Sequence, residues 1–244
     1  MVGDTQTLLA EPGPKLLKGV DLLKDLLPHE LVEIEELCRF KTFRAGTQVF
    51  DRQADTRDVF FVVRGRVRIV NYSMSGREIT LDDIGAGGHF GELAAIDSQP
   101  RSAAVLAVED SLIVALPQRH FIEALEKYPS IAVRVMKRLA RMVRASTERI
   151  MDLSTLAANN RVQAELLRQA RDTVKDDNTA DNTAVITPIP VHSDIASRVS
   201  TTRETVARVL SDLTRQGILE RTRDSLVIRD VERLEEMVEE VRGL

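Results

Sequence analysis

The spacing of apolar and polar positions changes twice along the chain. Residues 28–40 carry apolar positions at helical spacing and predict a helix. From residue 42 to 116 the pattern is one of short β-rich stretches separated by turns, and helical spacing returns at Pro117. The sequence therefore predicts a strand-rich region with helical regions before and after it.

The strand-rich region contains a buried run, Val59–Val63, and then near-alternating apolar positions on either side of the turn at Ser73–Gly76. Further turns are expected at Ala86–Gly88 and Glu109–Asp110. Strands are expected at 59–63, 67–72, 79–81, 103–107 and 112–116. Several short strands at this spacing indicate a sandwich or a barrel.

A long helix is predicted after Pro129, because residues 131–158 contain neither glycine nor proline. Seven positions within it recur at alternating three- and four-residue steps: Met136, Leu139, Val143, Ser146, Ile150, Leu153 and Ala157. This pattern is typical of a coiled-coil seam, and a second copy of the helix in a parallel dimer would cover it. The alternative is that the seam packs on its own domain.

The C-terminal region predicts two short helices joined by a tight turn. We expect a hinge at Asn159–Asn160, a helix over 162–173 and a polar loop or loose hairpin over 175–187. The first short helix, 192–200, can be capped by Ser193 or Asp194.

The second short helix, 203–210, can be capped by Thr202, and Gly217 follows its end. Two strands, 219–221 and 225–228, then form a small hairpin, so the region resembles a winged helix-turn-helix.

Charged side chains lie near the start of the second short helix. Arg203 and Arg208 can each make two bonds to guanine, and Glu204 can accept from the cytosine amino group. A solvated charged helix face is the alternative. The turn, the cap and the hairpin together favour DNA binding.

Composition limits the other functions. The chain has 244 residues and a net charge of −4, so DNA contact requires a local basic face. The single cysteine, Cys38, excludes an internal disulfide and a cluster held by several thiolates of the chain, and the four histidines share no metal-ligand spacing. We expect a cytoplasmic protein with no metal and no membrane contact, and no catalytic constellation indicates an enzyme.

The most specific motif runs from Phe90 to Ala103. Gly91 permits close approach of the backbone to a ligand, and Arg101 offers a charged donor fork to a phosphate. Ser102 adds a hydroxyl, whereas Glu92 is an acceptor suited to ribose hydroxyls. The alternative is a turn with a surface salt bridge between Glu92 and Arg101. The order FGELAA, a spacer and PRSAA resembles the phosphate-binding cassette of cyclic-nucleotide-binding domains.

With these motifs in order, the chain resembles the cyclic-AMP receptor branch of the Crp–Fnr regulators from about residue 31 to 228. The resemblance implies an α+β fold with a cyclic-nucleotide-binding β-roll, a long dimerisation helix and a C-terminal winged helix-turn-helix. The implied boundaries are 1–27 for an N-terminal extension, 28–128 for the β-roll, 129–158 for the dimerisation helix and 159–244 for the DNA-binding domain.

The resemblance also assigns roles to individual residues. The implied ligand-binding residues are Gly91, Glu92, Leu93, Ala94, Arg101, Ser102, Ala103, Ser146 and Thr147. The implied DNA-binding residues are Thr202, Arg203, Glu204, Thr205 and Arg208, and they favour an inverted repeat of TGTGA-type half-sites.

Cyclic AMP is the family's usual ligand. Cyclic GMP stays open, because the hydroxyls of Ser146 and Thr147 can serve either purine. The implied partners are operator DNA, a second copy of the chain and RNA polymerase. Ser200 occupies a turn position that is often glycine in the family, which is a departure from the pattern.

Overall fold

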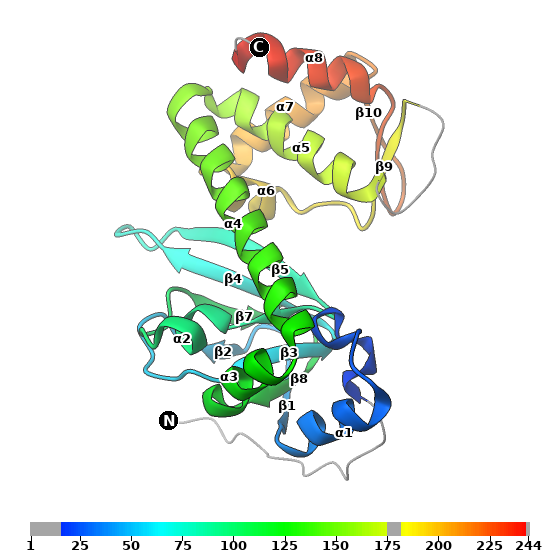
Figure 1. The fold of residues 1–244 in the computed structure, drawn as a ribbon. Helices are drawn as coiled ribbons and strands as arrows, with labels where there is room; N and C mark the ends of the chain where they lie inside the picture. The colour runs from blue at the N-terminus through cyan, green and yellow to red at the C-terminus, as the bar shows by residue number, and fades with distance from the viewer. Residues whose placement is uncertain (1–15, 175–181, 243–244) are drawn as a thin grey trace. The chain divides into compact units, whose positions relative to one another are not determined.

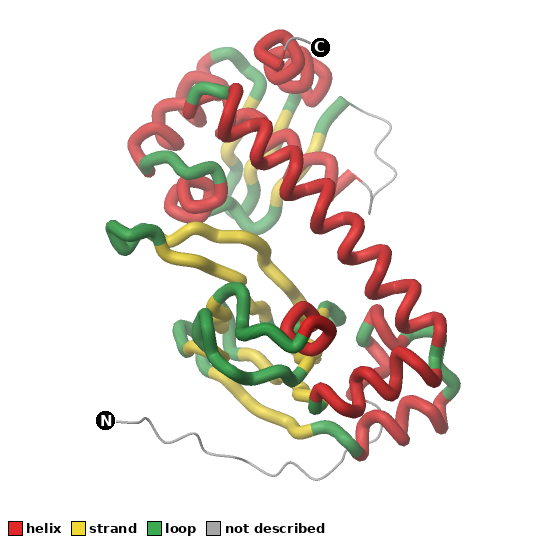
Figure 2. Tube along the Cα trace, turned by 60° about the vertical axis from the view of Figure 1, so that its left-hand side comes forward, coloured by secondary structure: helices red, strands yellow, loops and turns green. Residues whose placement is uncertain are grey.

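The computed structural model describes residues 16–174 and 182–242, and the chain divides into two compact units, Met1–Met142 and Val143–Leu244 (Figure 1). In each unit, helices accompany the strands (Figure 2). The predicted α+β class is thereby confirmed.

The first unit is built on two antiparallel four-stranded sheets. One sheet has the order β1 (Arg39–Phe43), β8 (Ser111–Leu116), β3 (Val59–Arg64) and β6 (His89–Phe90). The other has the order β2 (Gln48–Phe50), β7 (Ala104–Ala107), β4 (Arg66–Tyr72) and β5 (Glu78–Gly85).

Strand β3 shows why the predicted run of apolar residues is continuous. Phe60 and Val62 belong to the core between the two sheets, whereas Val59 and Phe61 belong to a second core under the helices. Because successive side chains of a strand point to opposite faces, a strand buried on both faces is apolar at every position.

The helices of the first unit cover the outer face of the β1-β8-β3-β6 sheet. They are η1 (Leu16–Gly19), η2 (Asp21–Leu23), α1 (Pro28–Glu36), α2 (Glu92–Asp97), α3 (Gln118–Lys127) and the start of α4 (Pro129–Thr155). Residues 16–27, which were expected to be an extension, contribute the buried side chains Leu17, Val20 and Leu22 to this core. The first fifteen residues of that extension lie outside the described residues.

The prediction of a helix over 28–40 was wrong at its C-terminal end. Helix α1 stops at Glu36, and Arg39–Phe43 forms strand β1 by pairing with β8. The pairing of this segment with a buried strand outweighs its helical spacing. Cys38 consequently lies between the two elements, half-buried, and burial raises the pKa of its thiol to about 12.

The second unit packs helices around a small sheet of order β10-β11-β9. Its elements after α4 are α5 (Ala158–Val174), β9 (Ala184–Ile186), α6 (His192–Arg198), α7 (Arg203–Arg215), β10 (Leu219–Arg221), β11 (Leu226–Ile228) and α8 (Val231–Arg242). The two predicted short helices and the hairpin are confirmed.

The break after the long helix lies earlier than predicted. Helix α4 ends at Thr155 and α5 begins at Ala158, so Asn159 and Asn160 already belong to α5. The buried side chain of Leu156 packs in the core of this unit, and its carbonyl oxygen accepts a 2.8 Å hydrogen bond from Arg161. These contacts fix the position of the break.

Two further predictions in this unit were wrong. Residues 184–186, predicted to belong to a polar loop or loose hairpin, form strand β9, which pairs with the distant strand β11. Residues 175–181 of the predicted segment lie outside the described part of the chain. Helix α6 is preceded by Val191 and has no side-chain cap, because it starts one residue before Ser193. The backbone carbonyl of Val191 accepts from the N–H of Asp194 at 2.9 Å.

Candidate functional site

Gly91 precedes α2 in a backbone conformation that requires glycine. Its φ is +87°, and a Cβ placed there would lie 2.7 Å from Nη1 of Arg101 and 3.0 Å from the carbonyl oxygen of Asp58. Both the left-handed conformation and the close approach exclude a side chain. The sequence motif therefore has a geometric reason for its glycine.

Arg101 is folded into the first unit, with 2% of its surface exposed. Its guanidinium donates from Nε to the Thr56 hydroxyl (3.1 Å), from Nη1 to the Gly91 carbonyl (2.9 Å) and from Nη2 to the Asp58 carbonyl (2.7 Å). These bonds use three of its five N–H donors. The group also lies 4.3 Å from the ring centre of Phe50, a cation–π contact.

Burial lowers the pKa of Arg101 to about 10, so the side chain remains charged at neutral pH. The result is a buried, oriented cation whose surroundings are fixed by backbone carbonyls. Such a group can bind an anion that approaches the Gly91 turn.

Glu92 is also buried, with 3% of its surface exposed, and its partner is Arg138 of α4. Arg138 Nε lies 3.4 Å from a Glu92 carboxylate oxygen, and Arg138 Nη2 lies 3.4 Å from Asp82 of β5. The salt bridge considered between Glu92 and Arg101 is thus replaced by one to Arg138. Sequence reasoning missed Arg138 and Asp82, because only the folded chain brings these separate segments together.

The other predicted residues of the motif differ in exposure. Leu93 and Ser102 are exposed, whereas Ala94 and Ala103 are buried. Asn71 of β4 donates from Nδ2 to the Ser102 carbonyl at 3.4 Å. The structure therefore brings Gly91, Glu92 and Arg101 together, with Ser102 following Arg101 at the surface.

Ser146 and Thr147 are exposed positions of α4 in the second unit. The Thr147 hydroxyl donates to the Val143 carbonyl at 3.0 Å, one turn back along the helix. That is the ordinary behaviour of a helical hydroxyl.

The predicted seam of α4 is largely uncovered. Met136 is 58% exposed, Val143 64% and Ile150 62%, while Leu139 packs partly against the core of the first unit. Large exposed apolar side chains in one stripe favour an interaction with another chain.

The turn between α6 and α7 accommodates Ser200 in the position where glycine is frequent. Ser200 has φ +53°, a left-handed conformation that costs a non-glycine residue roughly 1–2 kcal/mol. Arg161 of α5 donates from Nε to the Val199 carbonyl at 2.9 Å and from Nη2 to the Ser200 carbonyl at 3.2 Å. These bonds hold the turn in the required shape.

The predicted DNA-reading residues lie at the start of α7. Thr202 caps the helix, because its hydroxyl accepts from the Thr205 N–H at 3.3 Å. Arg203 and Glu204 are exposed. Hydrogen bonds from its own backbone N–H and from the Thr202 hydroxyl lower the pKa of the Glu204 carboxyl. Arg208 is exposed and donates from Nη2 to the Asn159 side chain at 3.3 Å.

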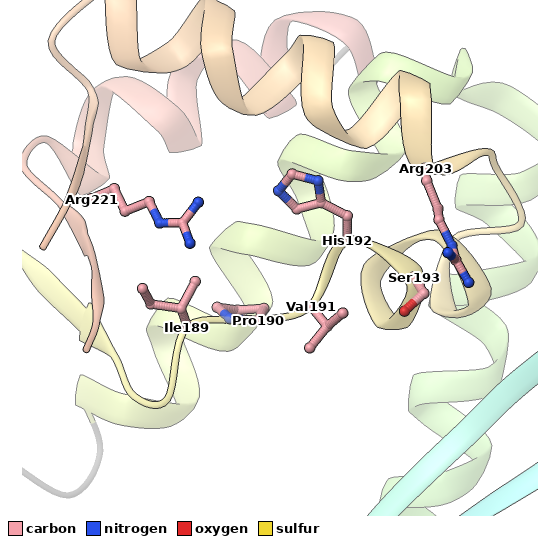
Figure 3. Close-up of a pocket in the computed structure, with 7 residues that line it drawn as sticks. All are labelled: Ile189, Pro190, Val191, His192, Ser193, Arg203 and Arg221. Carbon is pink, nitrogen blue, oxygen red and sulfur yellow. The ribbon is translucent and has the colours of Figure 1, made fainter. Parts of the chain in front are cut away.

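A groove of about 390 Å³ adjoins this helix (Figure 3). It is lined by residues 189–193, by Arg203 and by Arg221 of β10. In the described residues, no cluster of three or more histidines, cysteines or carboxylates could hold a metal ion. Within the same ranges no helix is long and apolar enough to cross a membrane.

Comparison with known sequences assigns each unit to a type of domain. A model of the cyclic nucleotide-binding domain matches residues 40–128, and a model of the Crp-like helix-turn-helix domain matches residues 160–237. A part of the chain also matches the lysophospholipase NTE1 of Chaetomium globosum, at 26% identity over 130 residues and only 8% of that enzyme.

Other relatives match over nearly the whole chain. The cyclic AMP receptor protein of Thermus thermophilus is 28% identical over 221 residues, which cover 91% of this chain and 98% of that protein. A CRP-like cAMP-activated global transcriptional regulator of Mycobacterium tuberculosis is 24% identical over 90% of this chain and 97% of its own length.

Solved structures agree on the fold. A CooA mutant from Carboxydothermus hydrogenoformans superposes with a TM-score of 0.77 at 24% identity, covering 96% of this chain and all of that one. The catabolite activator protein of Thermus thermophilus gives a TM-score of 0.51 at 28% identity, covering 90% of this chain and 99% of that one. Since both domain models and these whole-length relatives agree, the chain belongs to the Crp–Fnr family of transcription regulators, which are DNA-binding proteins and not enzymes.

Proposed function

We propose that this regulator responds to a cyclic nucleotide, with cyclic AMP as the ligand and cyclic GMP as the alternative. The observation that carries the proposal is the contact between Arg101 and Gly91, which places a buried cation directly beneath a turn that only glycine can form. The relatives named for cyclic AMP support that nucleotide.

In this proposal each end of the ligand has its own partner. Arg101 and the Ser102 hydroxyl bind the cyclic phosphate, together with the backbone of Gly91, Leu93 and Ala94, and Ala103 lies beside them. Glu92 accepts from the ribose hydroxyl, and Arg138 orients its carboxylate. Ser146 and Thr147 read the purine at the dimer seam.

The output is a dimer bound to operator DNA. The exposed stripe of α4 pairs with the same stripe of a second copy, which relates the two α7 helices by symmetry. Each α7 then enters the major groove of a TGTGA-type half-site with Arg203, Glu204 and Arg208, and Thr202 and Thr205 lie at its start. The half-sites form an inverted repeat about 34 Å apart.

The working division of the chain follows from these roles. Residues 28–128 bind the nucleotide, 129–158 form the dimer and 159–244 bind DNA, while residues 16–27 of the 1–27 extension complete the first domain. Nucleotide binding shifts the dimer toward the DNA-competent state, which requires tighter binding of the ligand to that state. A cytoplasmic location and contact with RNA polymerase belong to the same proposal.

One observation favours an alternative, a regulator of the same family that works without nucleotide. Arg101 already has three protein partners and an aromatic ring against it, an arrangement that a purely structural arginine would also have. In that case the cassette stabilises the domain and another signal controls DNA binding.

Calorimetric titration with each nucleotide separates the two possibilities. We expect wild type to bind cyclic AMP or cyclic GMP with measurable affinity, Arg101→Leu to lose that binding, and exposed Arg119→Leu to retain it. A thermal melt verifies that Arg101→Leu is folded. If neither nucleotide binds the wild-type protein, the result favours the purely structural role of Arg101.

A further inference from the structure

A small hollow of about 10 Å³ lies within the second unit, where α4, α5 and α6 meet (Figure 1). That volume has room for roughly one water-sized species. The wall of the hollow carries four arginines and one carboxylate: Arg149, Asp152, Leu153, Arg161, Arg168, Arg198 and Val199. Guanidinium groups gathered around so small a space repel one another, and negative charge must offset that repulsion.

The nearby carboxylates offset only part of this positive charge. Asp152, 6% exposed, accepts from Arg242 of α8 at 2.6 Å and from Arg168 at 3.4 Å, so each of its oxygens has a partner. Glu165, 3% exposed, accepts from Arg168 and lies 3.9 Å from Nε of Arg198. Two buried carboxylates are thus shared among three arginines.

The other two arginines of the wall have neutral partners. Arg149 donates from Nη2 to the Arg198 carbonyl, and Arg161 donates to the carbonyls of Val199 and Ser200. Among the residues that the structure describes, no carboxylate lies within 4 Å of Arg149 or Arg161. Arg149 uses one of its five N–H donors in its carbonyl bond, so its guanidinium can bind a further acceptor.

The electrostatic surroundings of Arg149 agree with this arrangement. Burial lowers the pKa of its guanidinium; the Glu165 carboxylate opposes the effect, and the charges of Arg168 and Arg198 add to it. Arg149 is half-buried, so solvent screens these interactions less than it would at an exposed position. An anion in the hollow would relieve the repulsion that the three arginines exert on one another.

We infer that the hollow binds a single small inorganic anion of about the size of chloride, held by Arg149, Arg161 and Arg168. Such an anion fits the small volume, and it accepts from charged N–H donors that come from two different helices. Arg149 and Arg161 also bond the carbonyls of residues 198–200, so bound anion stabilises the turn that precedes α7. The inference goes beyond the proposed function, because it assigns a ligand of its own to the second unit.

A chloride titration of the full chain, followed by the NMR line width of chloride, measures this binding in solution. Sodium glutamate keeps the ionic strength constant, and we expect a saturable broadening that bromide reverses. Arg149→Gln should weaken chloride binding at least about tenfold, because it removes a charge-assisted hydrogen bond. Arg144→Gln is the matched control and should bind as wild type does, since Arg144 lies exposed on the same helix outside the hollow.

Asp152→Asn tests the sign of the effect. The substitution removes the negative charge from the wall and nearly keeps its shape, so chloride should bind several-fold more tightly. Arginines that served folding alone would give no such gain. Thermal melts verify that both variants are folded, and if Asp152→Asn is not, Arg149→Gln and its control decide the question.

Crystals soaked in bromide locate the anion. We expect an anomalous peak in the hollow, beside the Arg149 guanidinium. Peaks at exposed arginines alone would identify an adventitious ion only and would overturn the inference. The same conclusion would follow if wild type gave no saturable broadening, or if Arg149→Gln and Arg144→Gln bound chloride equally well.

Discussion

The Nη1 atom of Arg101 donates a 2.9 Å hydrogen bond to the carbonyl oxygen of Gly91, and a Cβ on Gly91 would lie 2.7 Å from that same nitrogen. The backbone conformation at Gly91 and the position of the Arg101 side chain therefore depend on each other. The turn can form only without a side chain, and the guanidinium then occupies the space beneath it.

Gly91→Ala should destabilise the first unit and displace Arg101. Gly76→Ala is the matched control, because Gly76 also has a positive φ, +76°, but has no atom within 4 Å of the added Cβ. We expect Gly76→Ala to lower the free energy of unfolding by about 1 kcal/mol, and Gly91→Ala to lower it by at least about 1 kcal/mol more. Chemical denaturation measures both, and equal losses would contradict the account.

Replacing Arg138 alone should lower the free energy of unfolding more than replacing both Arg138 and Glu92. Arg138→Met leaves the buried carboxylate of Glu92 without its partner, a change that costs roughly 3 kcal/mol for buried pairs. Adding Glu92→Gln should recover part of the loss, and a double-mutant cycle measures the coupling. Additive effects of the two substitutions would show that the pair is not coupled.

His89 should make the protein less stable in acid. The ring is 6% exposed, and burial, with the charges of Arg138 and Arg141, lowers its pKa to about 3 from 6.5. Between those pH values the unfolded chain binds a proton that the folded chain does not. The free energy of unfolding therefore decreases by about 1.4 kcal/mol for each unit by which the pH is lowered.

Replacing His89 removes this contribution. His89→Gln should flatten the decline measured by denaturation between pH 6.5 and 4.5, whereas His29→Gln, at an exposed position, should leave it as in wild type. Identical pH profiles for wild type and His89→Gln would contradict the assignment.

The exposed stripe of α4 should hold the dimer together. Ile150→Glu places a charge in the seam and should convert the dimer to monomer in sedimentation experiments without loss of helix content, since Ile150 is 62% exposed. Ala145→Glu adds the same charge off the seam and should remain dimeric. A wild-type chain that sediments as a monomer would refute the proposed assembly.

Local signals in the sequence were sufficient for much of the fold. The run at Val59–Val63, the Thr202 cap and the glycine after α7 each predicted an element that the structure contains. These features depend on neighbouring residues, so that short stretches of sequence carry them. Strand β9 was missed because it forms only by pairing with β11, more than thirty residues away.

The candidate site likewise has a local part, which the sequence predicts, and a part that depends on residues far apart in the sequence. The motif around Gly91 and Arg101 is contiguous enough to be recognised in the sequence. Arg138 follows Glu92 by 46 residues, and its role emerges only when α4 packs beside the motif. Likewise, Arg161 holds the turn at Ser200 from a different helix, a compensation that no local pattern indicates.

The most direct test of the account is the affinity for an inverted-repeat TGTGA duplex with and without cyclic nucleotide. We expect saturating cyclic AMP or cyclic GMP to increase the affinity at least about fivefold, the lower range of typical allosteric coupling. Arg101→Leu should bind the duplex as the unliganded wild type does, whatever the nucleotide concentration. An affinity of wild type that neither nucleotide changes would contradict the claim that this chain is a nucleotide-gated regulator.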